Sequence, residues 1–324
     1  MSLLEITDLH VLFHLDREKT LHAVNGVTLT AKRGESVGLV GESGCGKTTL
    51  SNAVLKLVPV TNGYVTFDGQ NVLSFHGAEL LRFRHRAQMI FQDPFGSLNP
   101  RMSIGSMLDE VLMVHRMGTR KQRKQHIGEL LTTVGLESGY SSRYPHEFSG
   151  GQRQRIGIAR ALAVNPLFII ADEPVSALDV SVQVQILNLM KDLQQQRNLT
   201  YLFIAHDLAV VRYMCDRIYV MYSGRIMESA LSEELFANPA NPYTEALLAA
   251  IPDVEKGLTA HKKGIRRMVL KGETPSAAES VSGCPFHPRC RYAQDICRTC
   301  LPQVHEVSDG HQSLCHFPET FHRL

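Results

Sequence analysis

A glycine-rich octapeptide near the start of the chain has the residue types that bind phosphate groups. Residues 41–48 read Gly-Glu-Ser-Gly-Cys-Gly-Lys-Thr and match the spacing G-x-x-x-x-G-K-[ST]. Glycines let successive backbone N–H groups turn toward an anion, and the N-terminus of a following helix adds partial positive charge. Lys47 would reach the β and γ phosphates, and Thr48 would offer its hydroxyl to magnesium. The residues expected to bind a nucleotide here are Gly41, Ser43, Gly44, Cys45, Gly46, Lys47, Thr48 and Thr49.

Polar side chains also follow two apolar runs of the sequence. Asp172 and Glu173 come after the run 167–171, and His206 comes after the run 201–205. Because ligands bind outside the carboxyl ends of the strands in open α/β sheets, we expect these side chains on the edge that carries the phosphate loop. Asp172 would hold magnesium, Glu173 would accept a proton from a water attacking the γ-phosphate, and a neutral His206 would contact that phosphate or water. Taken alone, each would more often be a solvated strand-end residue.

Hydrophobic periodicity predicts the elements that position these residues. Continuous apolar runs at 36–40, 167–171 and 201–205 predict strands of a buried parallel sheet. Leu50, Ala53, Val54 and Leu57 predict one face of a helix after the phosphate loop, and further helices are expected at 151–163 and 180–197.

The remaining segments predict smaller units. Alternating stretches at 3–13, 24–29 and 64–67 indicate a small, mostly antiparallel sheet, and Ser223-Gly224 indicates a hairpin. Residues 77–144 lack strand patterning and predict an inserted helical subdomain. A polar, basic connector at 254–271 precedes a cysteine-rich tail.

Composition and charge exclude several classes of protein. The 324 residues are 44% hydrophobic and 20% charged, as in ordinary globular chains, and the net charge of +2 creates no field that would attract nucleic acid. No apolar run reaches the roughly 20 residues needed to cross a bilayer. The N-terminus lacks the basic-then-apolar order of a secretory signal, so we expect a cytosolic chain.

A third motif narrows the fold. Residues 148–152 read Phe-Ser-Gly-Gly-Gln, which resembles the signature of the ATP-binding cassette (ABC) ATPases. The motif would start a helix, with Ser149 as cap and the N–H groups of Gly150 and Gly151 facing an anion, although an ordinary capped helix would look the same. The resemblance implies that Ser149 to Gln152 bind the γ-phosphate of ATP held by a partner subunit, so that two chains meet head to tail.

The other family motifs occur in the same order along the chain. Gln92 resembles the loop glutamine that reaches the metal or the water, and His206 resembles the switch histidine. Residues 176–179, which end at Asp179, resemble the family segment that contacts the partner across the dimer. Phe13 occupies the position of the ring that stacks on adenine, where the family frequently has Tyr. The implied Mg²⁺ ligands are Thr48, Gln92 and Asp172. The implied fold is an α/β P-loop ABC ATPase, with a RecA-like parallel core, an antiparallel β subdomain and a helical subdomain at about 77–160, within residues 1–253.

Three stretches resemble the ATP-binding subunits of peptide or nickel importers: 91–100, 172–181 and 241–244. Asn241 departs from the His often found before Pro-Tyr-Thr. The resemblance implies import of dipeptides or oligopeptides, with a nickel chelate or another solute as alternatives. The implied partners are a second ABC ATPase subunit, either a paralogue or a second copy, two transmembrane permeases and, through the complex, a solute-binding protein. The chain would lie at the cytoplasmic side of the membrane.

Five of the seven cysteines fall in the expected C-terminal extension, residues 254–324. Cys284, Cys290, Cys297 and Cys315 have the spacing C-x5-C-x6-C-x17-C, and clustered thiolates suit zinc or iron–sulfur. These gaps are wider than those of common zinc sites, and the importer resemblance implies a [4Fe-4S] cluster on these four residues. Cys300 forms a C-x2-C pair with Cys297, so a zinc site with nearby histidines remains an alternative.

Two other functions fit the sequence less well than transport does. A cytosolic ABC ATPase acting on nucleic acid would use the basic runs at 82–86 and 116–124, but charge runs usually form a solvated helix face. Such proteins tend to carry two cassettes or a long coiled coil, which this sequence lacks, so we expect no nucleic-acid partner. A small-molecule P-loop kinase is disfavoured by the signature at 149–152.

Overall fold

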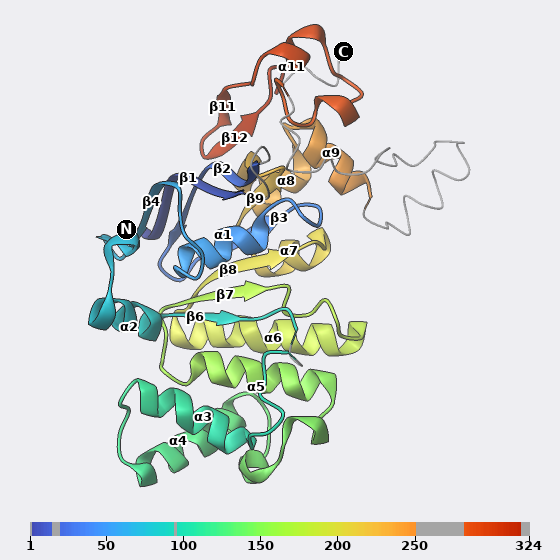
Figure 1. The fold of residues 1–324 in the computed structure, drawn as a ribbon. Coiled ribbons are helices and arrows are strands. Elements are labelled where there is room, and N and C mark those ends of the chain that lie inside the picture. Colours follow the sequence, from blue (N-terminus) through green and yellow to red (C-terminus); the bar gives the residue numbers. More distant parts are fainter. Residues whose placement is uncertain (1, 15–19, 94–95, 251–281, 319–324) are drawn as a thin grey trace, which may run out of the picture. The chain divides into compact units, whose positions relative to one another are not determined.

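The structure is a computed structural model that describes residues 2–14, 20–93, 96–250 and 282–318 (Figure 1). The chain divides into two compact units. Of these described residues, unit 1 contains those within 1–4, 31–36 and 66–204, and unit 2 contains those within 5–30, 37–65 and 205–324. The predicted connector at 254–271 lies outside the described residues.

Three parallel strands form the centre of unit 1, in the order β8-β7-β6. β7 (Phe168–Asp172) and β8 (Thr200–Ala205) are buried along their whole length, as their continuous apolar sequences predict. The helices α5 (Gly150–Leu162) and α6 (Val180–Arg197) run beside these strands (Figure 1) and agree closely with the predicted ranges. Asp172 therefore stands at the carboxyl end of a buried strand.

β6 (Ala87–Ile90) corrects the expectation that residues 77–144 contain no strand. It pairs in parallel with β7, from Ala87 opposite Phe168 to Ile90 opposite Ala171. A strand of four residues is too short to show a reliable period of two, so its sequence gave no signal. The strand matters for function because it leads directly into Gln92.

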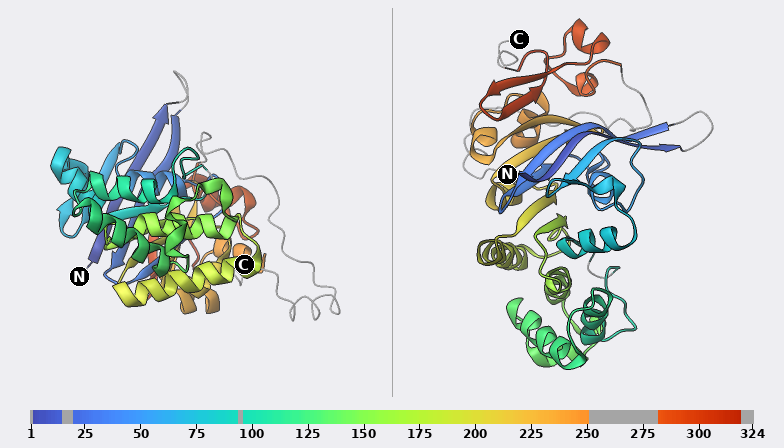
Figure 2. Two further views of the ribbon diagram at one scale, coloured as in Figure 1. Left: turned by 90° about the horizontal axis from the view of Figure 1, so that it is seen from below. Right: turned by 90° about the vertical axis from the view of Figure 1, so that its left-hand side faces the viewer.

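The rest of this region is helical, as predicted. It comprises α2 (Gly77–Arg86), α3 (Ile104–Val114), α4 (Arg120–Thr133) and the short 3-10 turns at Ser138–Ser142 and Pro145–Glu147. The left view of Figure 2 shows α3, α4 and α5 side by side. Leu108, Leu112, Ile127, Leu130 and Leu131 form the core between them.

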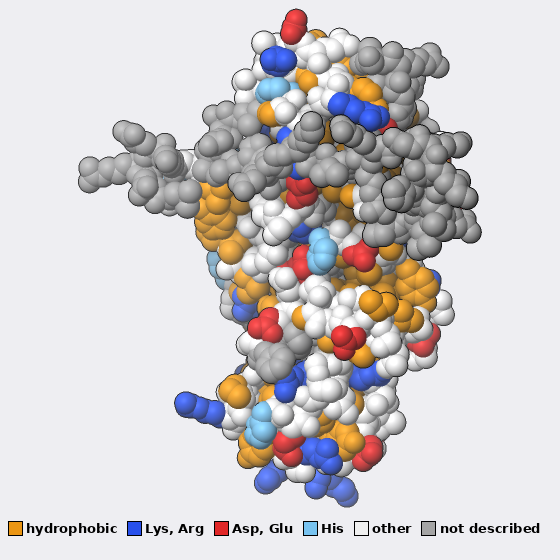
Figure 3. Space-filling model, turned by 90° about the vertical axis from the view of Figure 1, so that its right-hand side faces the viewer, with side chains coloured by type: hydrophobic (Ala, Val, Ile, Leu, Met, Phe, Trp, Pro, Cys, Tyr) orange, Lys and Arg blue, Asp and Glu red, His pale blue; other side chains and the backbone are white. Residues whose placement is uncertain are grey.

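The basic run at 116–124 covers the segment before α4 and the first residues of that helix. Arg120, Lys121 and Lys124 are exposed, and Arg123 donates to Asp109 at 2.6 Å. On the face drawn in Figure 3, blue basic side chains at the lower end are interspersed with red acidic ones. The run therefore forms a solvated helix face with mixed charge.

Five strands of unit 2 lie in the order β11-β12-β10-β9-β3. β3 (Ser36–Val40) pairs in parallel with β9 (Arg217–Tyr222), and β9 forms the predicted hairpin with β10 (Arg225–Leu231) through Ser223 and Gly224, both with positive φ. The long strands β1 (Ser2–His14) and β2 (Thr20–Lys32) lie next to each other, with β4 (Asn62–Phe67) beyond β1. In unit 1, the end of β4 pairs antiparallel with β5 (Gln70–Asn71), which precedes the 3-10 turn Val72–Ser74.

The helices of unit 2 include α1 (Lys47–Val54), which follows the phosphate loop. Leu50, Ala53 and Val54 are buried, but Leu57 is 51% exposed because the helix ends at Val54, which corrects the prediction of Leu57 as the fourth residue of the apolar face. The other helices are α7 (Leu208–Met214), α8 (Ser232–Ala237), α9 (Pro242–Ala249), the 3-10 turn His287–Arg289 and α11 (Asp295–Thr299).

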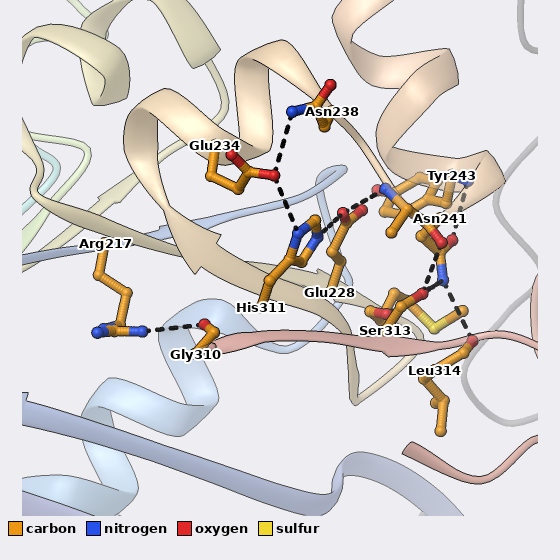
Figure 4. Close-up of polar contacts among 12 residues, drawn as sticks. Arg217, Glu228, Glu234, Asn238, Asn241, Tyr243, Gly310, His311, Ser313 and Leu314 are labelled. Carbon is orange, nitrogen blue, oxygen red and sulfur yellow. Dashed lines mark hydrogen bonds and ion pairs between the residues drawn. The ribbon is translucent and has the colours of Figure 1, made fainter. Parts of the chain in front are cut away.

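The C-terminal hairpin of β11 (Val304–Ser308) and β12 (His311–Leu314) extends the strands of unit 2, since β12 pairs antiparallel with β10. A buried polar network lies beneath this junction (Figure 4). His311 Nε2 lies 2.7 Å from Glu228 Oε1, and that oxygen also accepts from the N–H of Ala240. Asn241 Nδ2 donates to the carbonyls of Met227 and Leu314. The departure at Asn241 therefore has a structural use, because the side chain joins β10, β12 and α9.

Loss of the His311 imidazole should destabilise the chain strongly. His311 and Glu228 side chains are 2% and 0% exposed, so His311→Ala removes the side-chain partner of a buried carboxyl group and leaves it the N–H of Ala240. We expect a loss of about 2–4 kcal/mol in the free energy of unfolding, measured by urea denaturation. Glu234→Gln is the control, because Glu234 is 41% exposed and lies 3.8 Å from His311; a loss as large in this variant would contradict the assignment.

Candidate functional site

The phosphate loop joins the buried strand β3 to α1 within unit 2. Gly46 has φ +107°, and a Cβ atom there would lie 2.0 Å from the carbonyl oxygen of Ala23. At Gly41 a Cβ atom would lie 2.1 Å from the carbonyl oxygen of Met221. Because neither position has room for a side chain, these glycines are required by close backbone approach. The strand, loop and helix occur in the order that the motif predicts.

Lys47 places a buried positive charge in this loop. Its ammonium group donates to the carbonyl oxygens of Gly41 at 2.8 Å and Glu42 at 2.9 Å, and the residue is 5% exposed. Cys45 is 3% exposed, and burial raises the pKa of its thiol. Cys45 is thus a small, uncharged residue packed in the loop, while Ser43, Gly44 and Thr48 are exposed and Thr49 is half-buried.

Unit 1 contains the predicted acids. Asp172 is 4% exposed, and Glu173 directly follows β7 with φ +44°, a conformation that L-residues adopt at a cost of about 1–3 kcal/mol. The N–H of Glu173 donates to the carbonyl of Ile204 at 2.9 Å. Gln92 Nε2 donates to Glu173 Oε2 at 3.0 Å. The structure therefore brings together Gln92 and Glu173, two residues 81 positions apart in the sequence.

The signature residues form the first turn of α5. Ser149 is the N-cap, and its hydroxyl accepts from the N–H of Gln152 while the Gln152 side chain accepts from the N–H of Ser149. A Cβ atom at Gly151 would lie 2.5 Å from a methyl group of Val182 in α6, so this glycine also allows close helix packing. Asp179, the N-cap residue of α6, is exposed.

The two remaining predicted residues belong to unit 2. His206 follows β8 and is exposed, and the next residue, Asp207, caps α7 by accepting from the N–H of Ala209. Phe13 is half-buried near the end of β1. The stacking role of Phe13 and the switch role of His206 stay predictions.

The cysteine tail contains a second candidate site. Cys284, Cys290, Cys297 and Cys315 line one pocket together with Phe286 and other residues, whereas Cys300 is exposed and lies outside it. Burial is the largest cause that raises the pKa of Cys290 to about 11 and that of Cys315 to about 12, and neighbouring thiols of the same pocket contribute to both increases. Across the described ranges, no group of three His, Cys, Asp or Glu side chains is close enough to form a finished metal site. The four thiols therefore surround a common space without the tight spacing of a closed coordination shell.

Comparisons with known proteins agree with this geometry. A family model described as "ABC transporter" matches residues 24–176, and one described as "Oligopeptide/dipeptide transporter, C-terminal region" matches residues 227–297. A putative peptide import ATP-binding protein of Brucella ovis is 52% identical over 92% of this chain and 93% of its own length. The oligopeptide transport ATP-binding protein AppF of Bacillus subtilis is 50% identical over 91% of this chain and 89% of its own length.

Solved structures show the same fold. The ATP-binding cassette MJ0796, a dimer in a post-hydrolysis state bound to ADP and Pi, is 29% identical with a TM-score of 0.64, over 71% of this chain and 98% of its own. The cassette fold, the motifs and these relatives define the class: the chain belongs to the ATP-hydrolysing ATP-binding proteins of ABC transporters. Within that class it belongs to the oligopeptide/dipeptide transporter branch, which carries the distinctive C-terminal region. Among the described residues, no helix is long and apolar enough to cross a membrane.

The sequence motifs did not predict the contacts that Glu42 of the phosphate loop makes with the C-terminal part of the chain. Glu42 forms an ion pair with Arg289, and its N–H group donates to the hydroxyl of Tyr243. Arg289 and Tyr243 lie 247 and 201 positions from Glu42 in the sequence, respectively. The only available signal was the position of Arg289 next to Cys290, inside the cysteine motif.

Proposed function

We propose that the chain powers an importer of dipeptides or oligopeptides from the cytoplasmic side of the membrane. The observation that supports this most strongly is the identity of about half with peptide-import ATP-binding proteins along almost the whole chain, including the C-terminal region. Two permease subunits would form the membrane path, and a solute-binding protein would deliver the cargo. Transport rather than an action on nucleic acid also fits the mixed charge around α4.

The ATP site is completed by a second cassette, which is a paralogue or a second copy. Ser149, Gly150 and Gly151 begin α5, and a helix N-terminus with free N–H groups is suited to bind a terminal phosphate. The dimeric state of the related cassette MJ0796 supports this arrangement. Asp179, at the start of α6, would contact the partner.

Each residue then has a defined role in hydrolysis. The loop from Gly41 to Thr49 binds the phosphates, with the charge of Lys47 on the β and γ groups, and Phe13 stacks on adenine. Glu173 accepts the proton of the attacking water, Gln92 orients that water through its contact with Glu173, and His206 contacts the γ-phosphate. Mg²⁺ neutralises phosphate charge when bound, and the oxygen donors Thr48, Gln92 and Asp172 suit it.

The four pocket cysteines hold a [4Fe-4S] cluster in the C-terminal extension. Their shared pocket supports this ligand set, and the exposed position of Cys300 outside the pocket argues against the zinc alternative that pairs it with Cys297. Anaerobically purified protein should contain about four iron and four sulfide ions per chain. Cys290→Ser should lose them and Cys300→Ser should retain them, and stoichiometric zinc without iron would contradict the proposal.

Peptide uptake tests the transport function directly. In cells that lack the gene, the wild-type chain should restore uptake of a labelled tripeptide, and the Glu173→Gln variant should not. Labelled nickel chelate is measured in the same cells. If the wild-type chain restored nickel uptake but left peptide uptake as low as in the cells that lack the gene, the chain would be assigned to the alternative importer.

A further inference from the structure

We propose that Arg289, in the C-terminal region, positions the phosphate loop through Glu42, so that nucleotide binding and the packing of the cysteine pocket are coupled. The inference rests on the proposed nucleotide binding by this loop and adds a positioning residue from outside the ATP-binding motifs. All residues that carry it belong to unit 2.

The contact between Arg289 and Glu42 is a bidentate ion pair. Arg289 Nη1 donates to Glu42 Oε2 at 2.6 Å, and Nη2 donates to Glu42 Oε1 at 2.9 Å. The side chains are 7% and 22% exposed, respectively, so water screens the pair only weakly. Two parallel hydrogen bonds also fix orientation, because the planar guanidinium matches the carboxylate. Such a pair can hold a loop residue in one place.

Glu42 is fixed at its backbone as well as at its side chain. Its N–H group donates to the hydroxyl of Tyr243 at 3.0 Å, and its carbonyl accepts from Lys47 at 2.9 Å. Glu42 occupies the first position that the phosphate-loop motif leaves unspecified. It directly follows Gly41, which has no room for a side chain. A shift of Glu42 would therefore move the backbone groups that the loop presents to phosphate and the carbonyl that holds Lys47.

An aromatic cluster connects the same contact to the cysteine pocket. Tyr243 of α9 lies 4.7 Å from Tyr222 and 5.2 Å from Phe286 between ring centroids, and Tyr222 lies 5.4 Å from Phe286. Phe286 is 3% exposed and lines the pocket with Cys284 and Cys290. Arg289 stands between these cysteines in the sequence, so packing of the pocket determines where its guanidinium lies.

A phosphate loop that is already held in its binding geometry loses little conformational entropy when it binds phosphate. Without the Arg289–Glu42 ion pair, the entropic cost of ordering the loop falls on the binding step, and the affinity for nucleotide is weaker. Linkage is reciprocal, so nucleotide that binds the ordered loop must in turn stabilise the segment that holds it. The geometry thus predicts effects in both directions between the loop and residues 284–290.

A double-mutant cycle in the full chain tests the coupling, with a fluorescent ATP analogue and Mg²⁺ as the probe. Arg289→Ala and Glu42→Gln should each raise the dissociation constant about tenfold, and the double variant should be no weaker than either single variant. Arg291→Ala is the matched control. Arg291 lies two residues after Arg289 and carries the same charge, but its side chain is partly exposed and pairs with Glu245. This variant should change the dissociation constant less than about twofold. Additive effects in the double variant, or wild-type affinity in Arg289→Ala, would overturn the inference.

A second measurement does not depend on affinity alone. In the wild-type chain, nucleotide should slow amide hydrogen exchange in residues 284–290, and in Arg289→Ala this protection should be lost. Arg289→Lys keeps the charge without the paired geometry and should give intermediate affinity, which separates positioning from loss of folding. A wild-type chain that binds no nucleotide would overturn the proposed function together with this inference. Binding by wild type without added protection of 284–290 would overturn the coupling alone.

Discussion

Replacement of Glu173 by glutamine is expected to lower ATP turnover by at least about 100-fold while ATP still binds. Glu173 directly follows β7 in a backbone conformation that few L-residues adopt, and its carboxylate accepts a hydrogen bond from Gln92 at 3.0 Å. Glutamine keeps the size and the hydrogen-bonding capacity of the side chain but cannot accept a proton from water. The loss should therefore appear in steady-state phosphate release and not in the affinity for ATP.

The matched control for this variant is Glu306→Gln, which makes the same chemical change at an exposed position of β11. It should hydrolyse ATP like the wild-type chain. Near-normal hydrolysis by Glu173→Gln would refute the assignment of Glu173 as the general base. Loss of both turnover and binding would indicate a role in holding the nucleotide instead.

Gly46→Ala is expected to weaken ATP binding by about 100-fold or more, equivalent to about 2.7 kcal/mol. The added methyl group would lie 2.0 Å from the carbonyl oxygen of Ala23, so the backbone of the loop must shift. A shift at this position also moves the start of α1 and Lys47, the next residue. Isothermal titration with ATP and Mg²⁺ measures the effect.

Gly69→Ala is the control that separates the steric clash at Gly46 from the energetic cost of placing alanine at a positive φ. Gly69 has φ +77°, and a Cβ atom there would meet nothing within 4 Å. The variant should lose about 1 kcal/mol of stability and keep its affinity for ATP. Equal affinities of the Gly46→Ala and wild-type chains would show that the loop tolerates displacement and would contradict its role as the phosphate site.

The elements that carry ATP chemistry were predictable because their signals are local. The apolar runs of β3, β7 and β8 are buried on both faces, and such strands show continuous hydrophobicity in the sequence. The capping box at Ser149 is also local, since it depends on two residues three positions apart. Spacing and residue type were enough to locate these parts.

Parts that depend on distant contacts were not predictable. β6 has four residues, and its assignment as a strand depends on pairing with β7 rather than on its own pattern. The hydrogen bond between Gln92 and Glu173 and the ion pair between Glu42 and Arg289 join residues 81 and 247 positions apart. A polar side chain gives no sequence signal of the partner it will meet once the chain has folded.

The pairing of β12 with β10 has a consequence for the solubility of the protein. β12 pairs with β10 at Glu228 and Ser229 and so covers that part of the side of β10, and β11 presents exposed polar residues such as His305 and Glu306. A chain truncated before residue 282 would uncover the flank of β10, and uncovered strand flanks recruit copies of the same protein. The C-terminal hairpin is therefore expected to limit self-aggregation, and chains truncated before residue 282 should precipitate more readily than the full chain.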